Sequence, residues 1–182
     1  MPSLQTRALH RLRAPLLVVL AAAALTFPSE PSASIDERRL VFYHTHTNQR
    51  LEVVYARKGE YLEPALGAIG TFLADFRTGE RKEIDPALLD VLYDLRERLG
   101  NRGTYEVISA YRSPKTNEML RRNSSGVAKN SQHLEGKAID VRLRGVSTRK
   151  LRDTAIAMRR GGVGYYPESD FVHLDTGRVR RW

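Results

Sequence analysis

Two short stretches of this sequence contain side chains suited to binding a metal ion. The first, SQHLEGKAID, runs from Ser131 to Asp140 and holds His133 and Asp140 seven residues apart; the second, FVHLD, holds His173. Two imidazoles and one carboxylate form a ligand set for zinc, and three protein ligands leave a fourth position open for water, as in catalytic sites. Spacing alone is equally consistent with a loop and a strand that contain a hydrogen-bonded histidine.

Strand periodicity indicates how the two stretches could meet. Every second residue of 138–143 is a branched aliphatic residue, so Asp140, which lies between them, points away from the core. The stretch 171–175 alternates in the same way and places His173 and Asp175 on one face. If the two strands are neighbours in one sheet, the acid and the histidine converge, and the histidine of the preceding loop can fold over them.

Composition limits the available chemistry. The chain has no cysteine, which excludes disulfides, thiolate catalysis and metals held by cysteine. Its 30 Lys and Arg against 21 Asp and Glu give a net charge of +9, which favours an anionic partner such as a cell-wall polymer or a membrane surface. The basic residues have few aromatic residues among them, so we expect no nucleic-acid partner.

The N-terminal segment is typical of an export signal. Basic residues at the start are followed by an apolar run over 14–27 and by small residues at 32–34. The run is shorter than the ~20 residues that a spanning helix needs. We predict that residues 1–34 are a signal peptide or, as the alternative, an N-terminal anchor, that 35–182 form a single domain, and that this domain works in the periplasm.

The remaining sequence predicts an α+β domain, with a small mixed or antiparallel sheet and flanking helices. Helical and strand patterns alternate without a regular βαβ rhythm. Asp85 and Pro86 are typical of the N-cap and first position of a helix. The expected elements are a hairpin at 35–55, helices at 63–77, 85–100, 115–122 and 148–159, strands at 105–110, 138–143 and 171–176, a loop at 123–131 and a turn-rich segment at 161–167.

A second pair of histidines, His44 and His46, falls in the predicted hairpin. Both would lie on one strand face, where they could hold a metal. No carboxylate is close to them in the sequence, so we favour exposed polar positions on an edge hairpin.

Beyond these patterns, the sequence resembles a known family. The pattern S-x-H-x-x-G-x-A-x-D at 131–140, followed by a late histidine, is similar to that of the zinc D,D-peptidases of peptidoglycan metabolism, which include D-alanyl-D-alanine carboxypeptidases and VanX-type dipeptidases. SAYRS at 109–113, GVGYYP at 162–167 and FVHLDTG at 171–177 resemble the exported YcbK/MepK-type murein endopeptidase branch. The resemblance covers nearly all of 35–182 and implies the hedgehog/D,D-peptidase fold.

The resemblance also implies roles for individual residues. His133, Asp140 and His173 would be the ligands of one Zn²⁺ ion per chain. Arg112 matches an arginine that steadies the negative charge of the tetrahedral intermediate. Ser131 matches a serine that contacts the substrate, although it could equally cap the loop.

The general base is the open assignment. Dipeptidase relatives place a glutamate three residues before the last ligand, and this chain has Asp170 there, in DFVH. Strand periodicity puts Asp170 on the face opposite His173, so it can act only if the chain bends at the start of the strand. Asp175 shares the face of His173 and is the other candidate for the general base. Alternatively, it orients His173 through a hydrogen bond from the side away from the metal. We favour Asp170.

The function implied is that of an exported zinc-dependent murein peptidase that cleaves peptide bonds in peptidoglycan stems, with cross-link cleavage during cell-wall remodelling as the first choice. One alternative is a non-catalytic murein-binding module on the same fold. Another is a hydrolase of a different stem bond, such as L-alanyl-D-glutamate. Beyond an N-terminal anchor we expect no membrane partner, and the sequence leaves the oligomeric state open.

Overall fold

One mixed β-sheet runs through the part of the chain that the computed structural model describes, residues 36–123 and 126–182. The predicted signal peptide, residues 1–34, lies outside these residues. Within them, no helix is long and apolar enough to cross a membrane. The strands follow the order β3-β2-β1-β4-β5-β7-β6-β8 across the sheet. Their bounds are β1 Glu37–His44, β2 Arg50–Arg57, β3 Glu60–Tyr61, β4 Tyr105–Ser109, β5 Ala138–Leu143, β6 Gly162–Tyr166, β7 Phe171–Asp175 and β8 Arg180–Arg181.

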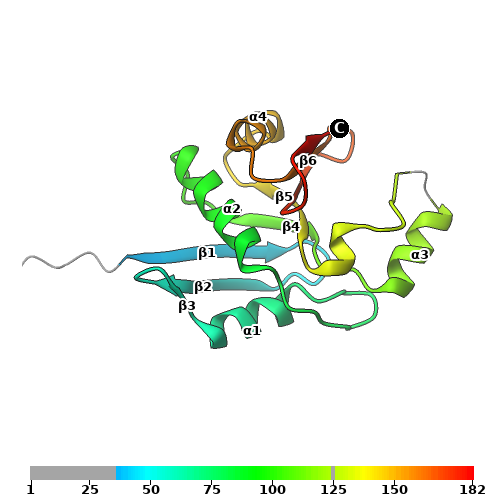
Figure 1. Cartoon of the computed structure of the whole chain (residues 1–182), viewed down its shortest axis with the longest axis horizontal. Coiled ribbons are helices and arrows are strands. Elements are labelled where there is room, and N and C mark those ends of the chain that lie inside the picture. The colour runs from blue at the N-terminus through cyan, green and yellow to red at the C-terminus, as the bar shows by residue number, and fades with distance from the viewer. Residues whose placement is uncertain (1–35, 124–125) are drawn as a thin grey trace, which may run out of the picture. The chain divides into compact units, whose positions relative to one another are not determined.

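The directions of the strands confirm the predicted α+β class. β1 pairs with β4 in parallel, and β6 pairs with β8 in parallel, whereas the other neighbours are antiparallel. Antiparallel neighbours need no crossover helix, so helices and strands do not alternate regularly along the chain. Figure 1 shows β1, β4 and β5 in the middle of the sheet.

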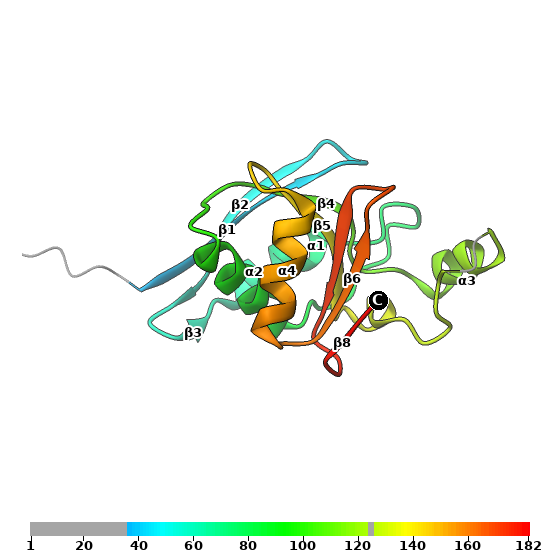
Figure 2. The same ribbon diagram turned by 90° about the horizontal axis from the view of Figure 1, so that it is seen from above.

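Four α-helices and one short 3₁₀-helix accompany the sheet in the described residues. Their bounds are α1 Glu63–Phe72, α2 Pro86–Arg98, α3 Pro114–Asn123, η1 Gln132–Glu135 and α4 Thr148–Met158. Helix α2 begins as predicted, because the Asp85 carboxylate accepts a hydrogen bond from the Ala87 N–H at 3.0 Å and Pro86 needs no partner for its nitrogen. Figure 2 shows α2 and α4 side by side over the sheet, and α3 standing away from it.

Helix α1 is shorter than the apolar spacing predicted. It ends at Phe72, and the chain then turns, because the Asp75 carboxylate accepts a hydrogen bond from the Arg77 N–H at 3.0 Å and the Asp75 carbonyl accepts one from Gly79. Aspartate competes with helical hydrogen bonds in this way. The resulting turn packs against the segment that carries Arg112.

The hydrophobic core lies on one face of the sheet. Ile139 and Val141 of β5 and Val172 of β7 have no exposed surface, and they belong to the same core as the leucines of α2 and Leu151 of α4. Each fully buried aliphatic side chain contributes about 1.5–3 kcal/mol relative to exposure. The side chains between them therefore have to point to the opposite face, as the alternation predicted.

Two details differ from the sequence expectation. The stretch 161–167 is mostly a strand, β6, rather than a turn, because Gly162–Tyr166 pair with β7 on one side and, at Gly162 and Val163, with β8 on the other. The first hairpin lies near one edge of the sheet, as expected, with only the two-residue strand β3 outside β2, but β1 itself is an inner strand between β2 and β4. His44, expected to be exposed, is 1% exposed and packs against Phe72 and Phe76.

Candidate metal centre and active site

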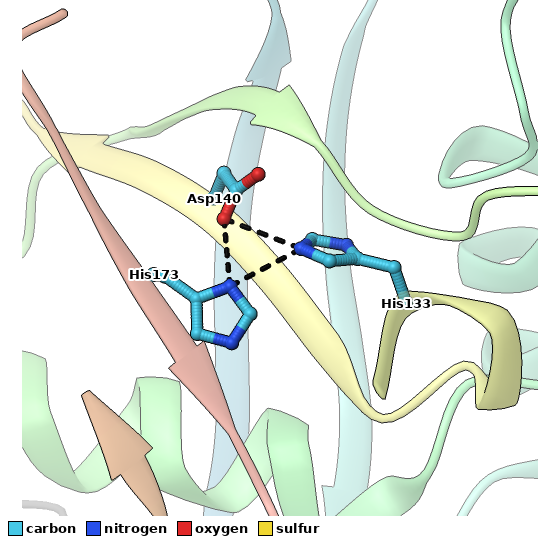
Figure 3. A group of neighbouring side chains, drawn as sticks. All are labelled: His133, Asp140 and His173. Carbon is cyan, nitrogen blue, oxygen red and sulfur yellow. Dashed lines mark hydrogen bonds and ion pairs between the residues drawn. The ribbon is translucent and has the colours of Figure 1, made fainter. Parts of the chain in front are cut away.

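His133, Asp140 and His173 meet on the face of the sheet opposite the core (Figure 3). Asp140 of β5 and His173 of β7 are directly paired across the two strands, and η1 holds His133 beside them. The distances are 2.9 Å from Asp140 Oδ1 to His173 Nδ1, 3.3 Å from Asp140 Oδ1 to His133 Nε2, and 3.2 Å between the two ring nitrogens. All three residues are buried. They are the one cluster of this kind among the described residues, and His44 and His46 are not part of such a cluster.

The turn of η1 aims His133 at the sheet. Ser131 caps the turn, since its Oγ accepts a hydrogen bond from the His133 N–H at 3.3 Å. Gly136 ends it in the left-handed conformation, with φ of 66°, and a Cβ there would overlap the Glu83 carbonyl oxygen. The glycine of the motif is therefore required by both the backbone conformation and the space available.

The outer nitrogen of each imidazole faces a hydrogen-bond acceptor, and the inner nitrogen faces the cluster. His133 Nδ1 lies 2.6 Å from the Ala110 carbonyl oxygen, which can only accept, so Nδ1 carries the proton and Nε2 faces the cluster. His173 Nε2 lies 2.9 Å from the Asp175 carboxylate, so Nδ1 of that ring faces the cluster. A carbonyl or carboxylate behind each histidine is the usual support of a metal ligand.

Three potential ligand atoms, His133 Nε2, His173 Nδ1 and Asp140 Oδ1, therefore converge on one point, which is an arrangement suited to a cation. Tetrahedral zinc with bonds of about 2.0–2.1 Å separates its ligand atoms by roughly 3.3 Å. The three separations in the structure, 2.9 to 3.3 Å, are close to that value. The donor set and its spacing thus fit a zinc ion.

The charges of the cluster follow from burial and proximity. Burial raises the pKa of Asp140, but the facing His133 and His173 lower it more, so the pKa lies below the ordinary range and the group is a carboxylate. Burial lowers the pKa of His133 and keeps that ring neutral. Burial also lowers the pKa of His173, but hydrogen bonds to Asp140 and Asp175 outweigh it and the net pKa is raised. A negative carboxylate between two imidazoles is an electrostatic site for a cation.

Arg112 lies beside the cluster, in the turn after β4. Its Nη2 is 3.7 Å from Asp140 Oδ2, and its side chain is 10% exposed. Nη1 and Nη2 are also within 3.4 Å of Asn117 and Ser109, whereas Nε has no hydrogen-bond partner among the described residues. The guanidinium is thus held in place through its two terminal nitrogens, while Nε is buried.

The backbone of the Arg112 turn is fastened to the metal cluster on one side. The Arg112 N–H donates to the His133 carbonyl at 3.1 Å, while the His133 ring donates to the Ala110 carbonyl. These two bonds run in opposite directions between the same two segments. The guanidinium and the ligand His133 therefore hold a fixed relative position.

On the other side, the same turn is fastened to the segment after α1. The Ser113 N–H donates to Asp75 Oδ2 at 2.9 Å, and the Tyr111 N–H donates to the Leu73 carbonyl at 3.2 Å. Asp75 is 2% exposed. Burial raises its pKa, but hydrogen bonds from Thr116, Ser113 and Arg77 lower it more, so Asp75 is ionised.

A cavity of about 620 Å³ opens over the cluster. Tyr166 and Phe171, whose rings stack at 4.6 Å, form part of its wall, and Ser131 lines it as well. The complete lining is Arg112, Gly126, Val127, Ala128, Asn130, Ser131, Gln132, His133, Asp140, Tyr166, Ser169, Phe171, His173, Arg180 and Trp182. All three cluster residues are reachable from this cavity, as a catalytic site requires.

Asp170, favoured from the sequence as the base, does not reach the cluster in this structure. The chain does bend at this residue, whose φ is 48°. Its carboxylate nevertheless accepts a hydrogen bond from Thr148 Oγ1 at 2.8 Å and lies 3.6 Å from the Arg142 guanidinium. Its neighbours Ser169 and Phe171 line the cavity, but Asp170 itself does not.

Asp175 lies behind His173, on the side away from the cluster. Oδ2 accepts from His173 and from Arg180, and Oδ1 accepts from the N–H groups of Gly162 and Gly177. The side chain has no exposed surface. Both oxygens are fully used, which suits orientation of the ligand rather than proton transfer.

Sequence reasoning missed Asp75, Arg180 and Trp182. Asp75 follows a helical pattern and carries no signal that it bonds a turn far along the chain. Arg180 belongs to the two-residue strand β8 and Trp182 follows it, and so short a strand has no alternating pattern of its own. Gly162 and Gly164 were the available clue, since glycines inside a strand mark a close approach of other atoms.

Comparisons with known proteins agree in one family. The family model described as "Peptidoglycan L,D-endopeptidase MepK" matches residues 32–182. The chain is 41% identical over 166 residues to peptidoglycan L,D-endopeptidase MepK of Escherichia coli (strain K12), covering 91% of each chain. It is 41% identical over 165 residues to a probable peptidoglycan L,D-endopeptidase MepK of Haemophilus influenzae, covering 90% of this chain and 87% of the relative. No solved structure gives a significant match.

Proposed function

The chain belongs to the peptidoglycan L,D-endopeptidase MepK family and is a peptidoglycan endopeptidase, and from this premise we propose that it cleaves cross-links between an L- and a D-configured centre with the help of one zinc ion. The observation that carries the metal is the convergence of three potential ligand atoms at 2.9–3.3 Å, with the outer nitrogen of each imidazole facing an acceptor. The L,D specificity is that of the named relatives, carried over to this chain.

We assign His133, Asp140 and His173 as the ligands of the zinc ion. A zinc ion held there would supply Lewis acid chemistry for hydrolysis of a peptide bond. The burial of all three ligands favours tight electrostatic binding of a cation, since the surrounding medium screens the carboxylate weakly.

Arg112 is assigned to the oxygen of the scissile carbonyl. A guanidinium that points at the place where negative charge develops lowers the barrier without reorganising. Its place in the cavity lining and its fixed position beside Asp140 support this role. Ser131, which lines the cavity and caps η1, is assigned to contact with the peptide stem as well as to the cap.

Asp170 is assigned as the general base, which needs a change of conformation. Asp175 has no free lone pair for a proton from water, because five donor groups from four residues surround its two oxygens. The Asp170 carboxylate is 61% exposed and is flanked by two cavity residues, Ser169 and Phe171. Release from Thr148 would free it to turn toward the cavity.

The finer assignments on fold and location rest on the same premise. We assign the sheet, with the cluster on one face and helices on the other, to the hedgehog/D,D-peptidase fold. The basic and apolar start of residues 1–34 and the location of peptidoglycan outside the cytoplasmic membrane support a signal peptide and a periplasmic enzyme.

The test is digestion of defined cross-linked muropeptides, followed by mass spectrometry of the products. Zinc-loaded protein should release monomers that are cut at the L,D bond, and a chelator should stop the release. His133→Ala should abolish it, whereas Glu135→Gln, a change at an exposed residue of the same short helix, should leave it intact. Equal activity of His133→Ala and wild type would refute the proposed metal site, and products cut at another bond would refute the proposed specificity.

A further inference from the structure

Arg180 of β8 is joined to the metal cluster through one intermediate carboxylate. Its guanidinium meets Asp175 as a fork, with Nη1 at 3.0 Å from Oδ1 and Nη2 at 2.7 Å from Oδ2. Oδ2 is also the acceptor of His173 Nε2, at 2.9 Å. A continuous chain of hydrogen bonds therefore runs from Arg180 to a ring nitrogen of a proposed ligand.

The fork has a fixed geometry because its partners are fixed. The Gly162 and Gly177 N–H groups hold Asp175 Oδ1 at 3.1 and 2.8 Å, so the carboxylate cannot rotate freely. The Arg180 guanidinium lies over the Trp182 ring at 4.9 Å, which restricts the cation from its other side. A bidentate arginine fixes the plane of a carboxylate better than a single point charge does.

The Trp182 indole packs against the same ligand. Its ring lies 5.1 Å from the His173 ring, tilted by 49°, and its Nε1 donates to the Tyr166 hydroxyl at 2.8 Å. His173 is thus held on its edge by Asp175 and on its side by Trp182. Arg180 contacts both of these supports.

Two glycines of β6 provide the space for this array. A Cβ on Gly162 would overlap Arg180 Nη1 and Asp175 Oδ2, and a Cβ on Gly164 would lie 2.7 Å from the Trp182 ring. Any other residue at either position would displace the fork or the indole. The array is therefore built into three neighbouring strands, β6, β7 and β8.

We propose that Arg180 is a positioning residue of the metal site: through Asp175 it holds the His173 ring with Nδ1 toward Asp140 and His133. The proposal rests on the proposed function for its metal. The geometric part of the proposal concerns the orientation and tautomer of His173, and it can be tested in protein without a metal ion.

The experiment compares wild type with Arg180→Gln, which removes both charge and fork, and with Arg180→Lys, which keeps the charge alone. Arg181→Gln, on the same strand with an exposed side chain, is the matched control. Two quantities are measured: zinc affinity by competition with a chelating dye, and the tautomer of His173 in zinc-free protein from the nitrogen shifts of its ring, at a pH where the ring is neutral.

We expect Arg180→Gln to weaken zinc binding by about 10–100-fold, the usual cost of losing support behind a ligand, and to mix the two tautomers of His173. Arg180→Lys should fall between it and wild type, and Arg181→Gln should match wild type. Unchanged zinc affinity with a single Nε2–H tautomer in Arg180→Gln would overturn the proposal. If that variant does not fold, Arg180→Lys decides by the same two readouts.

Failure of the proposed function gives a different result. Wild-type protein that binds no zinc refutes the metal site, yet the tautomer comparison in zinc-free protein still tests the positioning role of Arg180. A variant that loses thermal stability but keeps the wild-type tautomer and zinc affinity would show that the ion pair only fastens β8, which also overturns the proposal.

Discussion

Asp140 and His173 are direct partners across β5 and β7, and their side chains approach to 2.9 Å on the face away from the core. Because side chains alternate along a strand, a slip of one residue in this pairing would send one of them into the core. The hydrophobic residues on either side of each thus set the register, and with it the geometry of the metal cluster.

The two candidate acids can be separated by isosteric substitution. Asp170→Asn should lower kcat with zinc affinity unchanged, because the side chain does not touch the cluster. Asp175→Asn should weaken zinc binding by about 10–100-fold, because it removes the charged partner of His173. For both variants, kcat is measured on a defined muropeptide and zinc affinity by titration. Full activity of Asp170→Asn would show that another group is the general base.

Arg112 should act on the rate of the chemical step. Arg112→Ala is expected to lower kcat by about 10²–10³-fold, the usual effect of removing one donor to a developing oxyanion, with little change in zinc content. Arg112→Lys should recover only part of the loss, since an ammonium cannot reproduce the fork. Steady-state kinetics measure both, and Arg122→Ala on α3 serves as the exposed control. A kcat within about threefold of wild type in Arg112→Ala would contradict the role.

Asp75 should matter for catalysis although it lies away from the cavity lining. Asp75→Ala leaves the buried Ser113 N–H without its acceptor, at a cost of about 1–3 kcal/mol in the free energy of unfolding. It also loosens the turn that carries Arg112, and small displacements of a catalytic group can cost about 10²-fold in rate. Asp75→Asn keeps an acceptor oxygen and should rescue kcat in part. Urea unfolding and kinetics are measured together; lost stability with unchanged kcat would leave Asp75 a purely structural role.

His44 should make stability depend on pH. Burial, and then the neighbouring His46, lower the pKa of His44 below its ordinary 6.5. The unfolded chain thus binds the proton more readily, so the stability from the neutral ring is complete above pH 6.5 and declines as pH falls, by at most about 1.4 kcal/mol per pH unit.

Replacing His44 by phenylalanine should flatten that decline, because the aromatic contacts remain and the proton-binding group is gone. Free energies of unfolding from urea titrations between about pH 5 and 7, the range in which histidine titrates, measure the difference. His46→Gln, at an exposed position, should keep most of the decline. An identical pH dependence in wild type and His44→Phe would contradict the buried neutral histidine.

The alternation of apolar and polar residues along the strands was the most predictive feature of the sequence. It placed Asp140 and His173 on one face, because Ile139, Val141 and their counterparts in β7 could only point to the core. Residue type alone made His133 a candidate, and the resemblance to a family supplied its role as a ligand and the role of Arg112, since a loop residue and a turn residue have no periodicity from which their direction could be read. Both lie beside the cluster in the structure.

The supports of the site could not be predicted because they depend on contacts between distant segments. Asp75 binds a turn 38 residues further along the chain. Gly162 and Gly164 suggested a turn, since glycine is unfavourable inside a strand; only the position of Arg180 and Trp182 explains why a strand tolerates them. The direction of the Asp170 side chain could not be predicted either, because it depends on a hydrogen bond from Thr148 of α4.

The space above the two β6 glycines has a consequence for evolution. Because a side chain at Gly162 and the guanidinium of Arg180 would occupy the same volume, neither position can change by itself without loss. We expect these two positions, and likewise Gly164 and Trp182, to be inherited and lost together among homologues. A descendant that abandoned metal binding would be free of this constraint, so substitutions at all four positions would mark lineages in which the enzyme has become a binding protein.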